Sequence, residues 1–255
     1  MQLFYQQHGD AGVPLIILHG LLGSSDNWHT HAKLFGRHFR VFALDARNHG
    51  RSPHEPVFNY HVMAEDVHEF IQQHRLGAVH LLGHSMGGKT AMFLATLYPD
   101  AVEKLIVVDI APKASSPSHD EIFDALEGLD LSRYAYRKEI DEALSKRIPN
   151  FFTRQFVLKN LRRNADNSFD WKMNLDAIRK NHEGINAAVP NDRIFSKPTL
   201  FIKGGNSRYI LESDILAIHE IFPSARIATI AEAGHWVHSD APDPFASVVL
   251  DFLKP

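Results

Sequence analysis

The sequence predicts an α/β fold in which helices cover both faces of a mainly parallel β-sheet. Short apolar runs, each long enough for one strand, alternate along the chain with segments that have helical spacing. Runs such as 13–18, 40–44 and 103–108 are rich in apolar and β-branched residues, as expected for strands that are covered on both faces. This alternation favours a doubly wound arrangement with a mainly parallel sheet.

The expected elements can be placed from this pattern. The expected strands are a short edge strand at 2–7, followed by 13–18, 40–44, 78–82, 103–108, 199–202 and 225–230. The expected helices cover 59–75, 90–98, 214–222 and about 244–253. In the first of these helices, apolar residues recur at helical spacing, and Pro99 stops the second.

Residues 113–190 interrupt the alternation. They lack a clear buried strand and are rich in charged helical segments. Their middle, 133–163, carries nine Lys/Arg against three Asp/Glu, which we interpret as a solvated helical face in preference to a binding patch. We expect a single α/β domain over residues 1–255, with a helical lid inserted at about 113–190.

Composition narrows the class of protein. The 255 residues suffice for one large domain, and the net charge of −3 gives no reason to expect nucleic acid as a partner. The absence of cysteine excludes disulfides, zinc–thiolate sites and a catalytic thiol. The first residues do not resemble a signal peptide, and no apolar run reaches membrane-spanning length. We therefore expect a cytoplasmic protein without a membrane partner, and the sequence carries no signal for its oligomeric state.

The sequence GHSMG at residues 83–87 lies between an expected strand and an expected helix. It fits G-x-S-x-G, the nucleophile elbow, in which a sharp turn lifts the serine clear of the backbone. The turn is so tight that the residues two before and two after the serine nearly touch, so both must lack a Cβ atom. We expect Ser85 to be a nucleophile held in strained backbone geometry.

The same letters fit a second motif. Residues 83–90 read G-x-x-x-x-G-K-T, the Walker A pattern of nucleotide-binding P-loops, in which Lys89 would reach phosphates and Thr90 would hold Mg²⁺. That motif usually follows the first strand, whereas here it follows about the fourth, and it leaves His235 without a role. A glycine-rich turn without chemistry is the third interpretation.

Reactive side chains follow several of the expected strands. His19, Ser85, Asp109 and His235 each come directly after one. Ligands of open α/β sheets bind beyond the carboxyl ends of the strands, so we expect these side chains to converge. A serine nucleophile needs a base and an orienting carboxylate, and the order Ser…Asp…His is that of α/β-hydrolases.

Motifs along almost the entire chain carry a family resemblance. They are HG at 19–20, D-x-R-x-x-G-x-S at 45–52, GHSMG at 83–87 and GH at 234–235. With them the chain resembles the α/β-hydrolase superfamily, which implies the α/β-hydrolase fold. The longer strings DARNHG at 45–50, GHSMGGK at 83–89, VDIAP at 108–112 and GGNS at 204–207 resemble the small bacterial YbfF-type acyl esterases and their mitochondrial relatives.

The position of the acid departs from the common pattern. In most α/β-hydrolases the acid follows the penultimate strand, but here that turn carries Ser207, which cannot supply the negative charge that stabilises an imidazolium. Asp109 is the natural replacement, and the YbfF-type resemblance implies the same relocation. The rivals Asp214, Asp240 and Asp243 fall on a helix or beyond the histidine. With Asp109 as the acid, Ser207→Ala is expected to leave activity nearly intact.

These assignments predict a mechanism. Ser85 attacks an acyl carbonyl, His235 acts as general base and then general acid, and Asp109 fixes the orientation of the imidazole. The backbone N–H groups of Leu21 and Met86 are expected to form the oxyanion hole. No metal or organic cofactor is required.

Neighbouring residues receive more general roles. Leu22 and Trp236 are expected to line the acyl pocket, although Trp236 could equally be a core aromatic that packs the last turn. Asp45, Arg47 and Ser52 are expected to brace the active-site loops. No H-E-x-x-H metal motif occurs among the 17 histidines.

The elbow predicts a reaction class and not a substrate. The family resemblance implies small-molecule esters or thioesters of short to medium acyl chains, and the basic middle of the lid could attract an anionic leaving group such as coenzyme A. Methyl-ester hydrolysis, C–C bond hydrolysis and cofactor-free perhydrolysis use the same triad and stay open. Outside this class, a P-loop protein and a non-catalytic hydrolase fold are the remaining interpretations.

Overall fold

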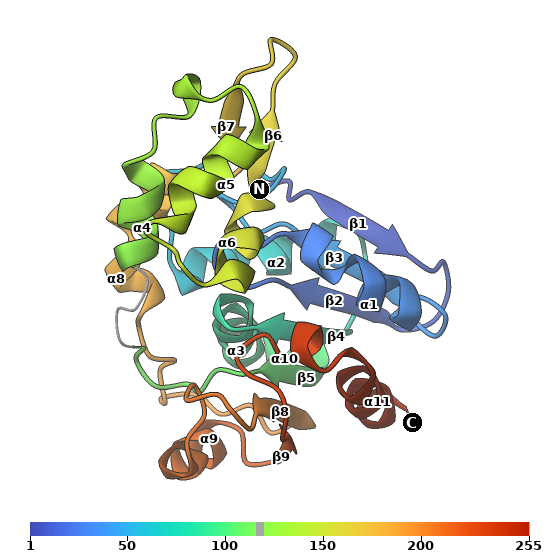
Figure 1. Cartoon of the computed structure of the whole chain (residues 1–255). Coiled ribbons are helices and arrows are strands. Elements are labelled where there is room, and N and C mark those ends of the chain that lie inside the picture. The colour runs from blue at the N-terminus through green and yellow to red at the C-terminus, as the bar shows by residue number, and fades with distance from the viewer. Residues whose placement is uncertain (116–119, 255) are drawn as a thin grey trace.

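The computed structural model describes residues 1–115 and 120–254 and has a seven-stranded sheet at its centre (Figure 1). The strand order is β1-β3-β2-β4-β5-β8-β9, and only β1 runs antiparallel to its neighbour. The strands are β1 (Tyr5–His8), β2 (Pro14–Leu18), β3 (Arg40–Leu44), β4 (Val79–His84), β5 (Val102–Val108), β8 (Thr199–Gly204) and β9 (Ala225–Ile230). The expected mainly parallel α/β fold is confirmed.

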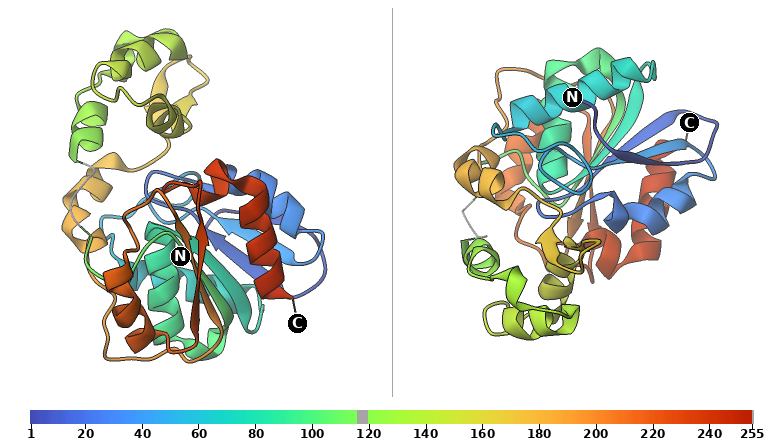
Figure 2. Two further views of the ribbon diagram at one scale, coloured as in Figure 1. Left: turned by 60° about the horizontal axis from the view of Figure 1, so that its bottom comes forward. Right: turned by 90° about the horizontal axis from the view of Figure 1, so that it is seen from above.

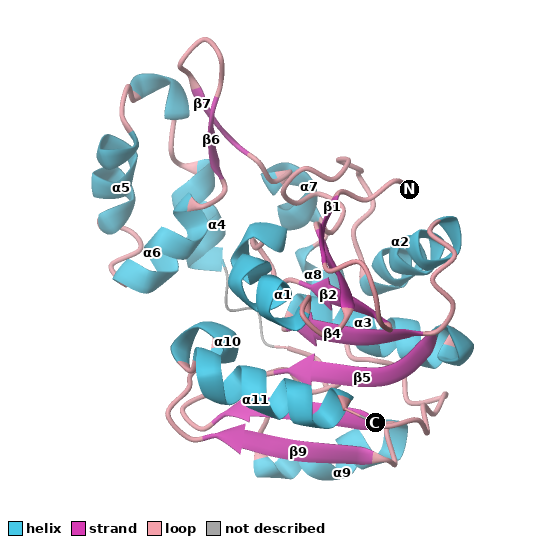
Figure 3. Cartoon of the chain, turned by 90° about the vertical axis from the view of Figure 1, so that its right-hand side faces the viewer, coloured by secondary structure: helices cyan, strands magenta, loops and turns pink. Residues whose placement is uncertain are grey.

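Helices pack on both faces of this sheet (Figure 3). One face is covered by α2 (Tyr60–Gln73), α3 (Met86–Leu97) and α9 (Ile215–Ile221), and the other by α1 (His29–Phe35) and α11 (Pro242–Leu253). Successive side chains of a strand point to opposite faces, so Ile16 packs in the first core and Ile17 in the second. This double burial explains why the strands are apolar almost throughout.

Some boundaries differ from those expected. The first strand begins at Tyr5, and the chain before it is not a strand. A 3-10 turn, Glu212–Asp214, precedes α9. The short helix α10 (Val237–Asp240) was not expected, because four residues are too few to show a helical period.

The segment between β5 and β8 carries helices and one small hairpin. Its elements are α4 (Asp120–Glu127), α5 (Arg137–Ser145), α6 (Phe151–Leu158), β6 (Leu161–Arg163), β7 (Phe169–Trp171), α7 (Leu175–Lys180) and α8 (His182–Ile185). We call residues 113–190 the insertion. Its helices α4–α6 form a lobe set apart from the sheet, on the side of the carboxyl ends of the strands (Figures 2 and 3). The hairpin was not expected, because its three-residue strands are half-buried or exposed and show no apolar run.

The chain enters and leaves the insertion through a narrow neck. The Ser115 N–H donates to the Asn186 carbonyl at 2.8 Å, and the Val189 N–H donates to the Pro112 carbonyl at 2.7 Å. The two crossings therefore lie side by side, although more than seventy residues of sequence separate them.

Lys89, on α3, donates hydrogen bonds to both crossings of this neck. Its side chain is fully buried, and Nζ donates to the Ser115 hydroxyl at 3.0 Å and to the Ala187 carbonyl at 2.7 Å. Tyr60 lies beside it, with its ring centroid 5.6 Å from Nζ and its hydroxyl donating to the Ile185 carbonyl. Burial lowers the pKa of Lys89 to about 8.

Candidate active site

Ser85 occupies a strained turn between β4 and α3. Its φ of 52° and ψ of −115° are unusual for a residue with a side chain. A Cβ atom on Gly83 would lie 2.1 Å from the Gly87 carbonyl oxygen, and one on Gly87 would lie 2.4 Å from that of Leu18. The two glycines therefore approach each other as closely as the elbow motif predicted.

Three side chains from three strand ends form one hydrogen-bonded chain. Ser85 Oγ lies 3.2 Å from Nε2 of His235, and His235 Nδ1 lies 2.8 Å from Oδ2 of Asp109. With the carboxylate accepting at Nδ1–H, Nε2 is free to accept the serine proton. The structure thus brings together the three residues that the sequence pointed to, in the arrangement that nucleophilic catalysis requires.

Asp109 is enclosed by hydrogen-bond donors. It is fully buried, and its Oδ1 accepts from the Gly204 N–H at 3.0 Å. The Ser207 hydroxyl donates to Oδ2, the same oxygen that faces His235. The turn that carries the acid in most α/β-hydrolases therefore still contacts the acid here. This contact changes our expectation for Ser207→Ala, which removes one of the donors to a buried carboxylate.

The rival aspartates are engaged elsewhere. Both oxygens of Asp214 bind Lys113 Nζ, at 2.8 and 2.6 Å. Asp240 accepts from the Gly234 N–H at 2.8 Å, which shapes the turn before the base, and Asp243 is exposed at the start of α11. Of these aspartates and Asp109, only Asp109 contacts the imidazole of His235.

Two residues that the sequence did not assign to the site hold His235. The ring of Tyr209 stacks on the imidazole, with centroids 3.8 Å apart and planes 19° apart. His84 Nε2 donates to the His235 carbonyl at 2.8 Å. Burial keeps the pKa of His84 well below its usual value, so the ring is neutral and one nitrogen carries the donated proton. No motif marks Tyr209, because its role depends on a turn that is distant in sequence.

The loop that carries Leu21 is held by two buried histidines. The first, His19, bonds through Nδ1 to the Gly20 carbonyl at 2.8 Å and accepts from the Ala46 N–H through Nε2 at 3.0 Å. Leu21 lines the same cavity as Ser85, and Met86 is the first residue of α3, where backbone N–H groups have no partner within the helix. Leu21 thus lies at the cavity and Met86 directly follows the serine, and their role as oxyanion donors stays a prediction.

The second histidine, His49, fixes the next residue of this loop. Its Nε2 accepts from the Leu22 N–H at 3.1 Å, and its Nδ1 bonds to the Arg47 carbonyl at 3.0 Å. Burial lowers the pKa of His49 to about 3, which keeps Nε2 able to accept. On its other side, Leu22 accepts a hydrogen bond from Asn160 of the insertion at 2.6 Å. The loop is thus attached both to the sheet and to the insertion.

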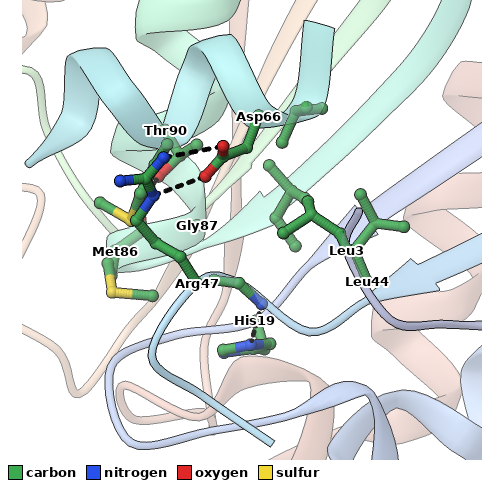
Figure 4. Close-up of a pocket in the computed structure, with 12 residues that line it drawn as sticks. Leu3, His19, Leu44, Arg47, Asp66, Met86, Gly87 and Thr90 are labelled. Atoms are coloured by element: carbon green, nitrogen blue, oxygen red, sulfur yellow. Dashed lines mark hydrogen bonds and ion pairs between the residues drawn. The ribbon is translucent and has the colours of Figure 1, made fainter. Parts of the chain in front are cut away.

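Behind the loop lies a buried ion pair. Arg47 binds both oxygens of Asp66 at 2.6 and 2.8 Å, close to His19 and Met86 (Figure 4). Nearby, Asp45 accepts from the backbone N–H groups of Ser25 and Arg51. These contacts fit the expectation that the 45–52 segment braces the active-site loops.

The cavity in front of Ser85 has a volume of about 330 Å³. Sheet loops form one wall and α6 forms another, and Leu22 and Trp236 both line it. Trp236 packs against Phe156 of α6, with ring centroids 5.5 Å apart. The lining residues are Gly20, Leu21, Leu22, His84, Ser85, Ile122, Thr153, Phe156, Val157, Tyr209, His235 and Trp236. The reactive groups thus face a largely apolar space.

Other kinds of site receive little support. The P-loop lysine, Lys89, is turned toward the neck of the insertion and bonds to protein atoms there. In the part of the chain that the structure describes, no three His, Asp or Glu side chains are grouped so that they could hold a metal ion. Among the same residues, no helix is both long and apolar enough to cross a membrane.

Comparison with known proteins decides the family. A family model described as "alpha/beta hydrolase fold" matches residues 13–242. The chain belongs to the α/β-hydrolase family. Among α/β-hydrolases, it is 42% identical to the mouse protein named sn-1-specific diacylglycerol lipase ABHD11, over 96% of this chain and 82% of that protein.

Two further α/β-hydrolases sharpen the relationship. Esterase YbfF of Escherichia coli is 34% identical, over 99% of this chain and 97% of its own length. A solved structure named marine microorganism esterase is 47% identical with a TM-score of 0.97, and 99% of each chain is covered. The resemblance to YbfF-type esterases is confirmed, and this α/β-hydrolase is an enzyme of the carboxylesterase type.

Proposed function

We propose that the protein is a serine hydrolase that cleaves carboxylic esters or thioesters of short to medium acyl chains. The observation that carries the proposal is the hydrogen-bonded chain from Ser85 through His235 to Asp109, which lies at the floor of an apolar cavity. A strained serine beside an imidazole that a buried carboxylate orients is the arrangement of an activated nucleophile.

The reaction proceeds through an acyl-enzyme. Ser85 Oγ attacks the carbonyl carbon while its proton passes to His235 Nε2, and the Asp109 carboxylate stabilises the imidazolium. The N–H groups of Leu21 and Met86 donate to the developing oxyanion, and each such donor contributes about 3 kcal/mol in the transition state. The imidazolium protonates the leaving alcohol or thiol, and water then attacks the acyl-enzyme by the same route.

The cavity supports the proposed substrate class. A volume of about 330 Å³ between apolar side chains suits a short or medium acyl chain better than an elongated polar ligand. Binding of coenzyme A as the leaving group stays a prediction that rests on the basic residues of the insertion. An unchanged KM for acyl-CoA after these residues are neutralised would remove it.

Labelling with a fluorophosphonate tests the mechanism. Intact mass is expected to show one adduct, and peptide mapping is expected to place it on Ser85. Ser85→Ala should abolish the adduct, whereas Ser132→Ala, which removes an exposed hydroxyl, should keep it. A wild-type protein that shows no adduct with a small probe would overturn the proposal. A series of nitrophenyl esters, methyl esters and acyl-CoAs then separates esterase, methylesterase and thioesterase activity.

A further inference from the structure

One stretch of the insertion is rich in basic residues. Residues 133–163 carry nine Lys/Arg against three Asp/Glu, whereas the whole chain has a net charge of −3. The rest of the insertion carries four Lys/Arg against nine Asp/Glu, so its positive charge is confined to residues 133–163. Within the described residues, the exposed side chains of Arg133, Arg137, Lys146 and Lys159 form no ion pair. These four cations are free to meet an anionic partner.

Two adjacent aromatic side chains stand out from the same region. Phe151 is 57% exposed and Phe152 is 74% exposed, at the first turn of α6. Their rings contact each other with centroids 5.7 Å apart, so they form one apolar patch. Phenylalanine has no polar group with which to compensate for exposure to water. Single exposed apolar residues are common on protein surfaces, whereas a contiguous exposed apolar patch indicates a binding partner.

The exposed pair is continuous with the wall of the active-site cavity. Phe156 and Val157 of α6 line the cavity. Phe152 precedes Phe156 by four residues and therefore lies on the same side of the helix, one turn away. Lys159, seven residues after Phe152, shares this side. One short helix thus joins exposed aromatic rings, a cationic side chain and the cavity wall.

We propose that the insertion docks on an anionic lipid surface, with Phe151 and Phe152 entering the interfacial layer and the exposed Lys/Arg side chains meeting lipid head groups. Aromatic rings partition into this layer, and basic side chains are attracted to anionic lipids in a manner that salt screens. The docking is peripheral.

This arrangement places the cavity beside the lipid. An acyl chain that leaves the layer near Phe152 meets Phe156 next and then the cavity. The substrate is accordingly a lipid-borne ester, and this statement alone rests on the proposed esterase function. The docking itself depends only on the surface of the insertion.

Vesicle binding tests the proposal. Wild-type protein is sedimented with vesicles of diether phosphatidylcholine, with and without diether phosphatidylglycerol, at low and high salt. Diether lipids lack ester bonds, so hydrolysis cannot alter the result. Binding is expected to be about tenfold stronger with the anionic lipid at low salt and to be lost at high salt. Equal binding to both vesicle types, or no binding at low salt, would overturn the proposal.

Matched variants locate the contact. Phe151→Ser with Phe152→Ser, and separately Lys146→Glu with Lys159→Glu, are each expected to weaken binding about tenfold or more. Leu216→Ser removes a side chain of α9 that is 73% exposed, and Lys33→Glu reverses an exposed charge on α1; both should bind as wild type does. Circular dichroism and thermal melting verify that each variant is folded. A folded double phenylalanine variant that still binds fully would contradict the proposal.

Two further readouts separate the alternatives. Light scattering without lipid tests whether the patch instead pairs two copies of the chain; a dimer that the phenylalanine substitutions dissociate would overturn the lipid assignment. Turnover of a water-soluble nitrophenyl ester is measured in parallel. Vesicle binding without turnover would refute the proposed function and leave the docking intact, whereas turnover without vesicle binding would do the reverse.

Discussion

The strand ends and the insertion differ in how far their functional side chains are buried. At the strand ends, Asp109 is fully buried and both of its oxygens take part in hydrogen bonds, so its side chain is held in one orientation. On the insertion, Phe152 is 74% exposed, and several cations have no ion-pair partner among the described residues. Groups that must keep a fixed geometry lie on strand ends, whereas groups that meet a variable partner lie on an outlying helical lobe. The predictions below test this contrast.

The largest loss of activity is expected when the buried acid, Asp109, is replaced. Asp109→Asn keeps the shape of the side chain but removes the charge that stabilises the imidazolium, and kcat should fall about 10⁴-fold with little change in KM. Asp214→Asn, which alters an aspartate paired with Lys113, should leave kcat near that of wild type. Steady-state kinetics on a nitrophenyl ester measures both. Equal activity of Asp109→Asn and wild type would falsify the assignment of the acid.

The second prediction concerns pH. Burial lowers the pKa of His49 from 6.5 to about 3, so the folded state disfavours the proton that the unfolded state accepts. Its contribution to stability is therefore complete above pH 6.5 and is lost as the pH falls toward 3. The free energy of unfolding should decrease on the order of 2 kcal/mol by about pH 5 from this residue alone.

Urea titrations of wild type and His49→Gln across this range measure the effect. The variant should show a shallower dependence of stability on pH. His61→Gln, which changes an exposed histidine on α2, serves as the control and should keep the wild-type slope. If the His49→Gln slope matches that of wild type, the attribution to His49 is wrong.

Replacing Lys89 should weaken the neck of the insertion. Lys89→Met leaves the Ala187 carbonyl and the Ser115 hydroxyl without their buried donor, which should cost about 2 kcal/mol of stability and raise KM more than it lowers kcat. Thr90→Val is a suitable control, because among the described residues the Thr90 hydroxyl bonds to the Met86 carbonyl of its own helix and to the sulfur of Met63. Thermal melting and kinetics on both variants would show whether the effect is specific to Lys89.

A smaller loss of activity is expected when Ser207, which donates to the acid, is replaced. Ser207→Ala removes one donor to Asp109 but leaves its charge and the Gly204 N–H in place, so kcat should fall about tenfold. Ser207→Thr keeps the hydroxyl and should recover most of the loss. A loss as large as that of Asp109→Asn would mean that Ser207 does more than position the carboxylate.

The smallest effect is expected on the surface of the insertion. Lys138 and Glu142 form an exposed pair at 3.8 Å along α5, and such pairs contribute little. Lys138→Gln should change the free energy of unfolding by less than about 0.5 kcal/mol. A larger change in urea unfolding would show that this lobe depends on its ion pairs.

The same contrast explains what could be predicted from sequence. Strands that are buried on both faces have long apolar runs, and the elbow has a steric requirement for two glycines, so both leave local signals. Asp109 was predictable because it follows the strand next to the elbow strand. These signals depend on neighbours in sequence or on the general rule that parallel strands end together.

Contacts between distant turns left no such signal. The stacking of Tyr209 on His235 and the bond from Ser207 to Asp109 join segments that only the folded sheet brings together. The β6–β7 hairpin escaped prediction because it buries little and therefore needs no apolar alternation. The sequence also suggested a P-loop, since a glycine turn followed by lysine looks the same whether the lysine binds phosphate or a neighbouring carbonyl.

The neck of the insertion also has a consequence for how such a protein can vary. Because Pro112 pairs with Val189, and Ser115 with Asn186, the two ends of this segment are already adjacent in the folded sheet domain. A replacement segment of quite different length could start and finish at the same points, since closing a longer loop adds only a small entropic cost. The sheet domain can therefore accept different insertions at this point. Exchange of the insertion would change the substrate range and leave the side chains at the strand ends unaltered.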